Sequence, residues 1–251
     1  MVDYSSLIER IHQPVNCVFF DSIESTNDYL SNQPFSETTQ LCITREQTKG
    51  KGQHGRTWCS KKDGSVLFSI RQNFDGGCDL SGLSLVVALA IVKSLEETCT
   101  IEKLGIKWPN DIYFGDKKLS GILLENQLHG DRQSVVIGVG VNYALGENLD
   151  CETPWVDLTT VSDSVVNIKA LTAAIINSIL AYVERFEKNG FESFQSEWAA
   201  YDILKGRVAK VVRVNNSFIG EVAGVNSKGA LLISSDEGVE AMYSSEQITY
   251  I

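Results

Sequence analysis

The chain has 251 residues, of which 43% are hydrophobic and 22% are charged, and its net charge is −10. Such a chain can bury a core large enough to fold without disulfides or a structural metal. The acidic balance argues against general nucleic-acid binding, because a protein needs a basic face to neutralise phosphates. A basic segment within this acidic chain would instead indicate a small anionic ligand.

The cysteines, histidines and apolar runs exclude further classes. The six cysteines form no CxxC pair, and they show no metal-ligand spacing with the three histidines. We interpret them as free thiols in a reducing compartment. The N-terminus is too polar for a signal peptide. The longest apolar run, residues 83–92, is far below the roughly 20 residues that a membrane span needs. We expect a cytoplasmic protein without a membrane partner.

The first predicted elements are a short helix at residues 4–11 and a buried strand at residues 15–20. A second helix follows Ser25, Thr26 and Asn27, which are favourable N-cap residues. The first turn of that helix would present hydroxyls and free N–H groups. Plain helix capping explains the same three residues, so this segment alone decides nothing.

A glycine-rich loop follows at residues 46–58, with the sequence EQTKGKGQHGRTW, between two predicted strands. Its glycines allow a ligand to approach main-chain N–H groups closely, and its Lys and Arg residues add positive charge. The loop matches neither the Walker A pattern nor a GxGxxG that opens a helix. It is therefore either a phosphate-binding loop or a solvated basic hairpin loop.

The middle of the chain predicts a long helix and then a meander of three strands. The helix, residues 79–99, shows one apolar stripe at helical spacing: Leu80, Leu83, Val87, Ala90, Ile91 and Leu95. The strands are expected at residues 106–114, 118–128 and 133–143. In the last strand Gly138 and Gly140 alternate with valines, which indicates that something lies flat on that face, or else a β-bulge or tight helix packing.

The C-terminal third begins with a polar, aperiodic stretch at residues 144–164, followed by amphipathic helices at residues 168–186 and 191–198. From Gly206 onward, short apolar runs alternate with turn signals. We expect a small antiparallel sheet or barrel there. It is too short to be stable alone, so it should pack on the main domain.

Five motifs resemble those of the biotin protein ligases, in the same order and spacing. They are STN (25–27), Q-x-x-G-x-G-x-x-G-R-x-W (47–58), KWPND (107–111), KLSGIL (118–123) and GVGVN (138–142). The resemblance runs from about residue 15 to the end of the chain. A single motif could arise by chance, whereas KWPND followed by KLSGIL after such a loop is highly specific.

The resemblance implies a fold and a reaction. The expected fold is α+β, with a mixed sheet flanked by helices in a catalytic domain similar to class II aminoacyl-tRNA synthetases (residues 1–204). A small SH3-like barrel would follow (residues 205–251). The implied reaction joins biotin and ATP into biotinyl-5′-AMP and pyrophosphate. Biotin then passes to one lysine of a biotin carboxyl carrier protein domain, the partner in a biotin-dependent carboxylase.

The resemblance also implies site residues. The expected catalytic residues are Lys118, Asp111, Lys51 and Arg56, with Asp111 orienting the acceptor lysine and taking its proton. The expected biotin contacts are Ser25, Thr26, Asn27, Gln47, Gly50, Lys51, Gly52, Gln53, Lys118 and Gly121. The expected nucleotide contacts are Lys51, Arg56, Trp58, Lys107, Asn110, Asn142 and Trp155. Mg²⁺ would be bound to the phosphates, with its protein ligands unknown.

Two features depart from the family pattern. Lys51 and Gln53 stand where members commonly have Arg, which predicts a looser hold on the adenylate. The first catalytic strand begins near residue 15, so we expect no N-terminal helix-turn-helix, no DNA partner and no repressor function. A homodimer through sheet edges is possible.

Two alternatives remain open. The first is a lipoate or octanoyl ligase or transferase of the same superfamily. The transferases use a cysteine nucleophile, and Cys59 would have only His54 as a nearby base. The second is a non-catalytic biotin-binding protein. Release of pyrophosphate from ATP would separate an enzyme from such a binder.

Overall fold

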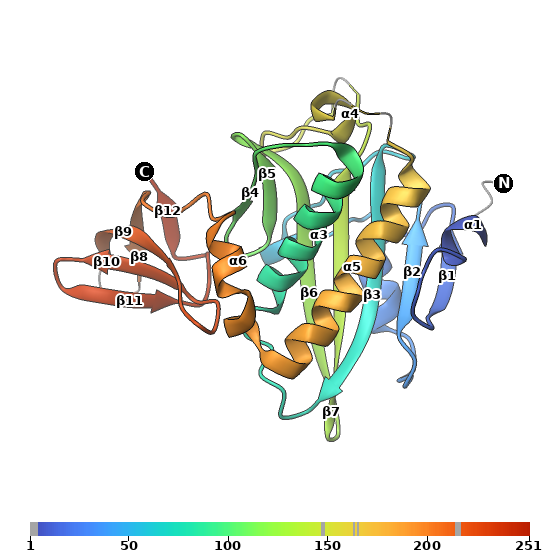
Figure 1. Cartoon of the computed structure of the whole chain (residues 1–251), viewed down its shortest axis with the longest axis horizontal. Helices are drawn as coiled ribbons and strands as arrows, with labels where there is room; N and C mark the ends of the chain where they lie inside the picture. The colour runs from blue at the N-terminus through green and yellow to red at the C-terminus, as the bar shows by residue number, and fades with distance from the viewer. Residues whose placement is uncertain (1–4, 147–148, 163, 165, 214–216) are drawn as a thin grey trace.

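Two β-sheets organise the computed structural model, which describes residues 5–146, 149–162, 164, 166–213 and 217–251 (Figure 1). The larger sheet has the strand order β1-β2-β3-β7-β6-β5-β4, and the smaller has the order β11-β10-β9-β8-β12. Strands β1 and β2 run parallel, and the other neighbouring pairs are antiparallel. The larger sheet comprises β1 (Asn16–Phe20), β2 (Gln40–Thr44), β3 (Ser65–Asp75), β4 (Leu104–Lys107), β5 (Asp111–Phe114), β6 (Lys117–His129) and β7 (Arg132–Asn142).

The helices lie mainly over the larger sheet. They are α1 (Ser5–Ile8), α2 (Thr26–Ser31), α3 (Leu83–Cys99), α4 (Leu158–Val161), α5 (Ile168–Asn189) and α6 (Gln195–Ala199), with 3-10 turns η1 (Gln53–Gly55) and η2 (Phe191–Phe194). Helices α3 and α5 run side by side over one face (Figure 1). The prediction of an α+β fold with a mixed sheet flanked by helices is confirmed. No helix among the described residues is long and apolar enough to cross a membrane.

The side-chain pattern of β7 explains how the sheet separates its two faces. Val135, Ile137, Val139 and Val141 belong to the main core with α3 and α5. Successive side chains of a strand point to opposite faces, so the residues between them face α2 and the glycine loop. Those residues include Gly138, whose Cα lies directly against Asn27 of α2. One face of β7 is thus packed core, and the other is open for a site.

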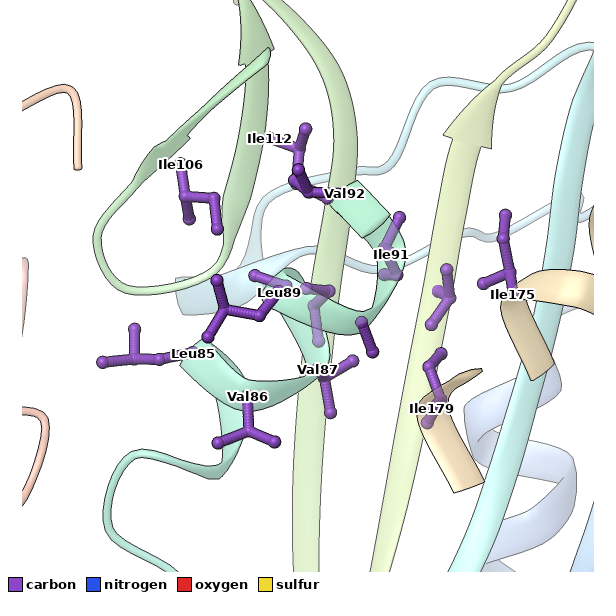
Figure 2. Close-up of a cluster of buried hydrophobic side chains, with 14 of the residues drawn as sticks. Leu85, Val86, Val87, Leu89, Ile91, Val92, Ile106, Ile112, Ile175 and Ile179 are labelled. Carbon is purple, nitrogen blue, oxygen red and sulfur yellow. The ribbon is translucent and has the colours of Figure 1, made fainter. Parts of the chain in front are cut away.

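The predicted apolar stripe of α3 is buried, and from Leu85 to Val92 the burial extends around the whole helix. Four side chains outside that stripe are at most 1% exposed, namely Leu85, Val86, Leu89 and Val92. Figure 2 shows these side chains pointing in different directions from α3, whereas Val87 and Ile91 lie on the side of Ile175 and Ile179 of α5. The reason is tertiary: the sheet covers one side of α3 and α5 covers another.

The predicted three-strand meander consists of four strands. Residues 106–114 are not one strand, because Trp108, Pro109 and Asn110 form a turn between β4 and β5. The Trp108–Pro109 peptide bond is cis. This turn brings Lys107 opposite Asp111 in an antiparallel pair. Two smaller predictions are corrected. Helix α1 is shorter than the predicted residues 4–11, of which residue 4 lies outside the described part. The stretch 144–164, predicted to be aperiodic, contains α4.

The smaller sheet packs against the larger one, as predicted. It comprises β8 (Val208–Val212), β9 (Ser217–Val225), β10 (Leu231–Ser235), β11 (Gly238–Met242) and β12 (Ile248–Tyr250). The turn after β9 makes the contact: Trp108 Nε1 donates to the Gly229 carbonyl at 2.9 Å, and Lys228 Nζ lies 3.1 Å from Asp79 Oδ2. The SH3-like form of this sheet and a division of the chain at residue 205 stay predictions.

Candidate active site

A cavity of about 410 Å³ opens on the sheet face that carries α2 and the glycine loop. Its walls come from the start of α2, the loop after β2, the strands β5 to β7 and the segment before α4. Motifs that are far apart in the sequence therefore meet at one place. The predicted site residues that line it are Ser25, Thr26, Asn27, Gln47, Lys51, Gly52, Gln53, Arg56, Trp58, Asn110, Asp111, Lys118, Gly121, Asn142 and Trp155.

Two predicted site residues, Gly50 and Lys107, do not line this cavity. Gly50 is buried beneath the loop, and its carbonyl accepts a hydrogen bond from the Trp58 N–H at 3.0 Å. The Lys107 ammonium lies 5.5 Å from the centre of the Tyr113 ring and 5.4 Å from that of Tyr250. Burial lowers the pKa of Lys107, and Asp111 opposes that shift. Lys107 thus lies between the two sheets, within electrostatic range of the site.

The start of α2 forms one end of the cavity, and its polar groups are already hydrogen-bonded. Ser25 caps the helix, since its Oγ accepts from the Asp28 N–H at 3.3 Å. The Thr26 N–H and hydroxyl both donate to Gln47 Oε1, at 2.8 and 2.9 Å. Ser69 Oγ lies 2.7 Å from the Thr26 hydroxyl. Helix capping and a fixed array of polar groups are therefore both present here, in the same residues.

Asn27 is the group that lies flat on β7 at Gly138. A Cβ atom on Gly138 would be 2.1 Å from Asn27 Oδ1. The Asn27 amide donates to Glu125 Oε2 at 2.7 Å, and its Oδ1 lies 2.6 Å from Ser69 Oγ. No motif in the sequence indicated Glu125 or Ser69. They follow from strand register, which places alternate residues of β3 and β6 beside α2.

Trp58 covers the adjacent part of the same face. A Cβ atom would lie 2.8 Å from its ring at Gly121 and 2.4 Å from it at Gly140. The Lys118 ammonium lies 5.4 Å from the ring centre. The indole Nε1 is buried without a hydrogen-bond partner. The alternating glycines of β7 are therefore spaced for Asn27 and Trp58, and a buried donor remains unpaired in the cavity wall.

Lys118 and Asp111 form an ion pair in the cavity, with Nζ 2.8 Å from Oδ1. Their side chains are only 21% and 18% exposed. The turn before β5 and the pairing of Asp111 with Gly121 bring the two residues together. The main chain of Lys118 also bonds to the segment before α4, through its N–H to Pro154 O at 2.9 Å. Trp155 is thereby held beside Lys118.

The two asparagines that were expected to contact adenine also hold the main chain together. Asn110 Nδ2 donates to the Ile122 carbonyl at 2.6 Å. Asn142 Nδ2 donates to the carbonyls of Lys118 and Val156, at 3.1 and 3.0 Å. Both N–H groups of the Asn142 amide are thus engaged, which leaves its oxygen for a further partner. Both side chains fix the positions of β6 and the segment beside it.

The charged side chains of the loop lie at the mouth of the cavity. Lys51 Nζ is 2.6 Å from Asp28 Oδ1, and that hydrogen bond raises the pKa of Lys51. Arg56 Nε donates to the Gln53 carbonyl at 3.3 Å. The Lys51 ion pair is about half exposed, so solvent screens it and the pair is weak. Lys51 is therefore free to exchange Asp28 for an anionic ligand.

Ionic contacts join the two ends of the glycine loop at its base. Arg45, directly after β2, lies 2.5 Å from both Asp21 and Asp63. Asp63 precedes β3 and has a φ of 61°. These contacts join the chain just before the loop to the chain that follows it, and the loop residues between them line the cavity.

The loop tip contacts the smaller sheet rather than a nucleophile. His54 Nδ1 lies 2.8 Å from Glu246 Oε1, in the turn before β12. Cys59 donates instead to the Asp150 carbonyl at 3.9 Å. The cysteine–histidine pair that a transferase would use is therefore not formed. Among the described residues, no cluster of three or more His, Cys, Asp or Glu side chains could hold a metal ion.

Comparisons with known proteins identify a family. Residues 19–142 match the biotin/lipoate A/B protein ligase family. The chain is 31% identical over 221 residues to the bifunctional ligase/repressor BirA of Escherichia coli, covering 85% of this chain and 68% of that protein. It is 26% identical to a biotin–[acetyl-CoA-carboxylase] ligase of Paracoccus denitrificans, covering 89% of this chain and 96% of that protein.

A solved structure shows the same fold. The biotin protein ligase from Aquifex aeolicus in complex with biotin and ATP superposes with a TM-score of 0.80 at 26% identity. The match covers 94% of this chain and 98% of that one, so it includes both sheets. The motifs, the cavity they form and these matches agree: the chain belongs to the biotin/lipoate A/B protein ligase family, among the biotin protein ligases.

Proposed function

We propose that this protein activates biotin with ATP and transfers it to a lysine of a biotin carboxyl carrier protein domain. The observation that carries the proposal is the single cavity in which Lys118 and Asp111 lie between the α2 start and the glycine loop. One end has fixed, neutral polar groups that suit a ureido ring. Lys51 and Arg56 of the glycine loop add positive charge to the cavity wall, which suits phosphates.

In the first half-reaction, a biotin carboxylate oxygen attacks the α-phosphorus of ATP, and pyrophosphate leaves as the new C–O–P bond forms. Both reactants are anionic, so their approach requires positive charge at the reacting centre. Lys118 is placed to supply it, because its ammonium is partly buried and lies beside Trp58. Lys51 and Arg56 would neutralise the remaining phosphate charge.

In the second half-reaction, the acceptor amine attacks the carbonyl carbon of biotinyl-5′-AMP and AMP leaves. The attacking lysine must lose a proton. Asp111 is the carboxylate that lies in the cavity beside Lys118, so it is the group proposed to orient the amine and accept that proton. In the free protein the Lys118–Asp111 contact keeps both charges compensated.

Mg²⁺ is proposed to bind with ATP, where it would reduce the negative charge of the phosphates. Asp111, Asp150 and Glu152 all line the cavity, but they do not form a three-ligand cluster among the described residues. We therefore assign the ion to the phosphates and not to a dedicated protein site.

The remaining proposals concern partners and location. We propose a biotin carboxyl carrier protein domain as the acceptor, and an SH3-like fold for the smaller sheet. A homodimer is proposed through an edge of the larger sheet, where β1 and β4 are the outer strands; analytical ultracentrifugation would measure it. Cytoplasmic location and the absence of DNA binding are also proposed, and a mobility-shift assay tests the latter.

The test is pyrophosphate release from ATP without any acceptor protein, first with biotin and then with lipoate. Release with biotin alone is expected and would support the first half-reaction. Release with lipoate alone would assign the chain to the lipoate side of the family. Biotin binding without pyrophosphate release would contradict an enzymatic role. Addition of a purified carrier domain, with mass spectrometry of its lysines, then tests the transfer step.

A further inference from the structure

Two cysteines, Cys59 and Cys151, meet at the wall of the cavity without any part in the proposed chemistry. Cys59 directly follows Trp58 at the end of the glycine loop, and Cys151 lies in the segment that leads to Trp155. Both line the cavity, both are partly exposed, and both are free thiols. The two cysteines thus belong to different walls of the same cavity.

The two cysteines are neighbours. Cys59 Sγ donates to the carbonyl of Asp150, the residue before Cys151, at 3.9 Å. Interaction with Cys59 also contributes to the raised pKa of the Cys151 thiol. A second close pair, Cys17 and Cys42, lies on the neighbouring strands β1 and β2, but Cys42 is completely buried. An oxidant in solution can therefore reach Cys59 and Cys151, and it cannot reach Cys42.

We propose that Cys59 and Cys151 form a reversible disulfide that joins the glycine loop to the segment before α4 and prevents ATP from entering the cavity. The effect on ATP rests on the proposed function, whereas the disulfide itself does not. Trp58 and Trp155 lie near the two sulfurs in sequence, and both line the cavity. A covalent link between the two walls would stop them from separating to admit a nucleotide.

The oxidant is a peroxide, and the step balances. The Cys59 thiolate attacks one peroxide oxygen, the O–O bond breaks, and Cys59 becomes a sulfenic acid. The Cys151 sulfur then attacks the Cys59 sulfur, hydroxide leaves, and the Cys151 proton converts it to water. Two thiols and hydrogen peroxide give one disulfide and two waters. Burial, with a smaller contribution from Cys59, raises the pKa of Cys151 to about 12, so Cys59 is the thiol that reacts first.

The disulfide is tested by mass spectrometry, which does not depend on activity. The full-length protein is treated with hydrogen peroxide, alkylated and digested without reductant. The expected product is a Cys59–Cys151 linked peptide, absent in Cys59→Ser and in Cys151→Ser. Cys78→Ser is the matched control, because Cys78 is also partly exposed but lies away from the cavity; it should still form the link. No linked peptide in the oxidised wild type, or a peptide that links Cys59 to a cysteine other than Cys151, overturns the proposal.

The effect on the cavity is tested by measuring ATP binding and pyrophosphate release. Both are measured with reduced protein, with oxidised protein, and with oxidised protein that has been treated with dithiothreitol. Each variant is compared with its own reduced form. After oxidation, wild type and Cys78→Ser should lose ATP binding. Their rate of pyrophosphate release should fall by roughly 10²-fold, the scale expected for misplaced reacting groups. Dithiothreitol should restore both. The Cys59→Ser and Cys151→Ser variants should be unaffected. Unchanged ATP binding in the linked protein overturns the block. Lack of pyrophosphate release by reduced protein contradicts the proposed function alone.

Discussion

At the residue scale, the site depends on charges that compensate one another before any substrate binds. Lys118 lies against Asp111, and Lys51 lies against Asp28. The first pair is largely buried and the second is about half exposed. Buried pairs are costly to break, whereas exposed pairs are weak. We therefore expect Lys118 to stay in place on substrate binding, while Lys51 changes partner.

The first prediction compares two adjacent lysines. Lys118→Ala should slow pyrophosphate release by roughly 10²–10³-fold, the usual effect of removing one group that stabilises charge in the transition state. Lys117→Ala is the matched control, because Lys117 is exposed and does not line the cavity. Steady-state kinetics with biotin and ATP would measure both. Equal rates in the two variants would contradict the role of Lys118.

The second prediction concerns the space that Gly140 leaves for Trp58. Gly140→Val places carbon atoms where the indole ring now lies. The ring must move, so we expect a loss of about 1–3 kcal/mol in the free energy of unfolding, typical of overpacking, and a higher KM for ATP. Gly77→Val is the control, since nothing lies within 4 Å of a Cβ atom there. Urea denaturation measures the free energy of unfolding, and steady-state kinetics measures the KM for ATP. If Gly140→Val and Gly77→Val gave the same two values, the close contact between Gly140 and the Trp58 ring would not matter.

At the scale of elements, α3 shows how the core supports the site. It contacts β4, β5 and β6 on one side and α5 on the other. Strands β5 and β6 carry Asp111 and Lys118 on the opposite, open face. The packing of α3 against the other face of the sheet therefore holds these strands in place, although α3 does not line the cavity.

The third prediction tests this packing. Leu89→Ala in α3 removes a completely buried side chain and should lower the free energy of unfolding by about 2–5 kcal/mol. Leu128→Ala in β6 is the control, because Leu128 is 74% exposed and its truncation should change stability by less than about 0.5 kcal/mol. Chemical denaturation gives both values. Similar small losses would mean that α3 is not part of the cooperative core.

At the scale of the whole molecule, the smaller sheet and its turns contact the main domain near the site. The turn at Gly229 accepts from Trp108, Tyr250 lies beside Lys107, and Glu246 contacts His54 at the loop tip. Asp202 lies where the chain passes from one sheet to the other, paired with Ile106 of β4. Its Oδ1 accepts from the Leu204 N–H at 2.9 Å, and its Oδ2 is buried without a hydrogen-bond partner.

The fourth prediction follows from the titration of Asp202. Burial raises its pKa, against the effect of main-chain hydrogen bonds from Leu204 and Lys205. A carboxyl whose pKa is raised by folding favours the folded state when protonated, and this contribution is lost as the pH rises through the folded pKa. Asp202→Asn keeps the acceptor oxygen and removes the charge. It should raise the Tm at neutral pH, with the gain vanishing in acid. Thermal unfolding across pH measures this; a gain independent of pH would contradict it.

Much of the site follows from the sequence because its chemistry is local. STN, the glycine loop, KWPND and KLSGIL each indicate a turn, a cap or a charge that a short segment specifies by itself. The family followed from their order, and the cavity does contain fifteen of the predicted residues. The pair of glycines at 138 and 140 likewise indicated a close approach on one face, although not which groups approach.

What only the tertiary structure decided is which residues meet across strands and between sheets. Glu125 and Ser69 reach Asn27 through strand register; Lys107 lies between the sheets, outside the cavity. Helix α3 is buried beyond its apolar stripe, all around from Leu85 to Val92, because two layers cover it. Cys59 reaches the main chain beside Cys151 because two loops converge. Periodicity along the chain records the preference of each segment for one buried face, whereas contacts between distant segments arise only when the layers pack.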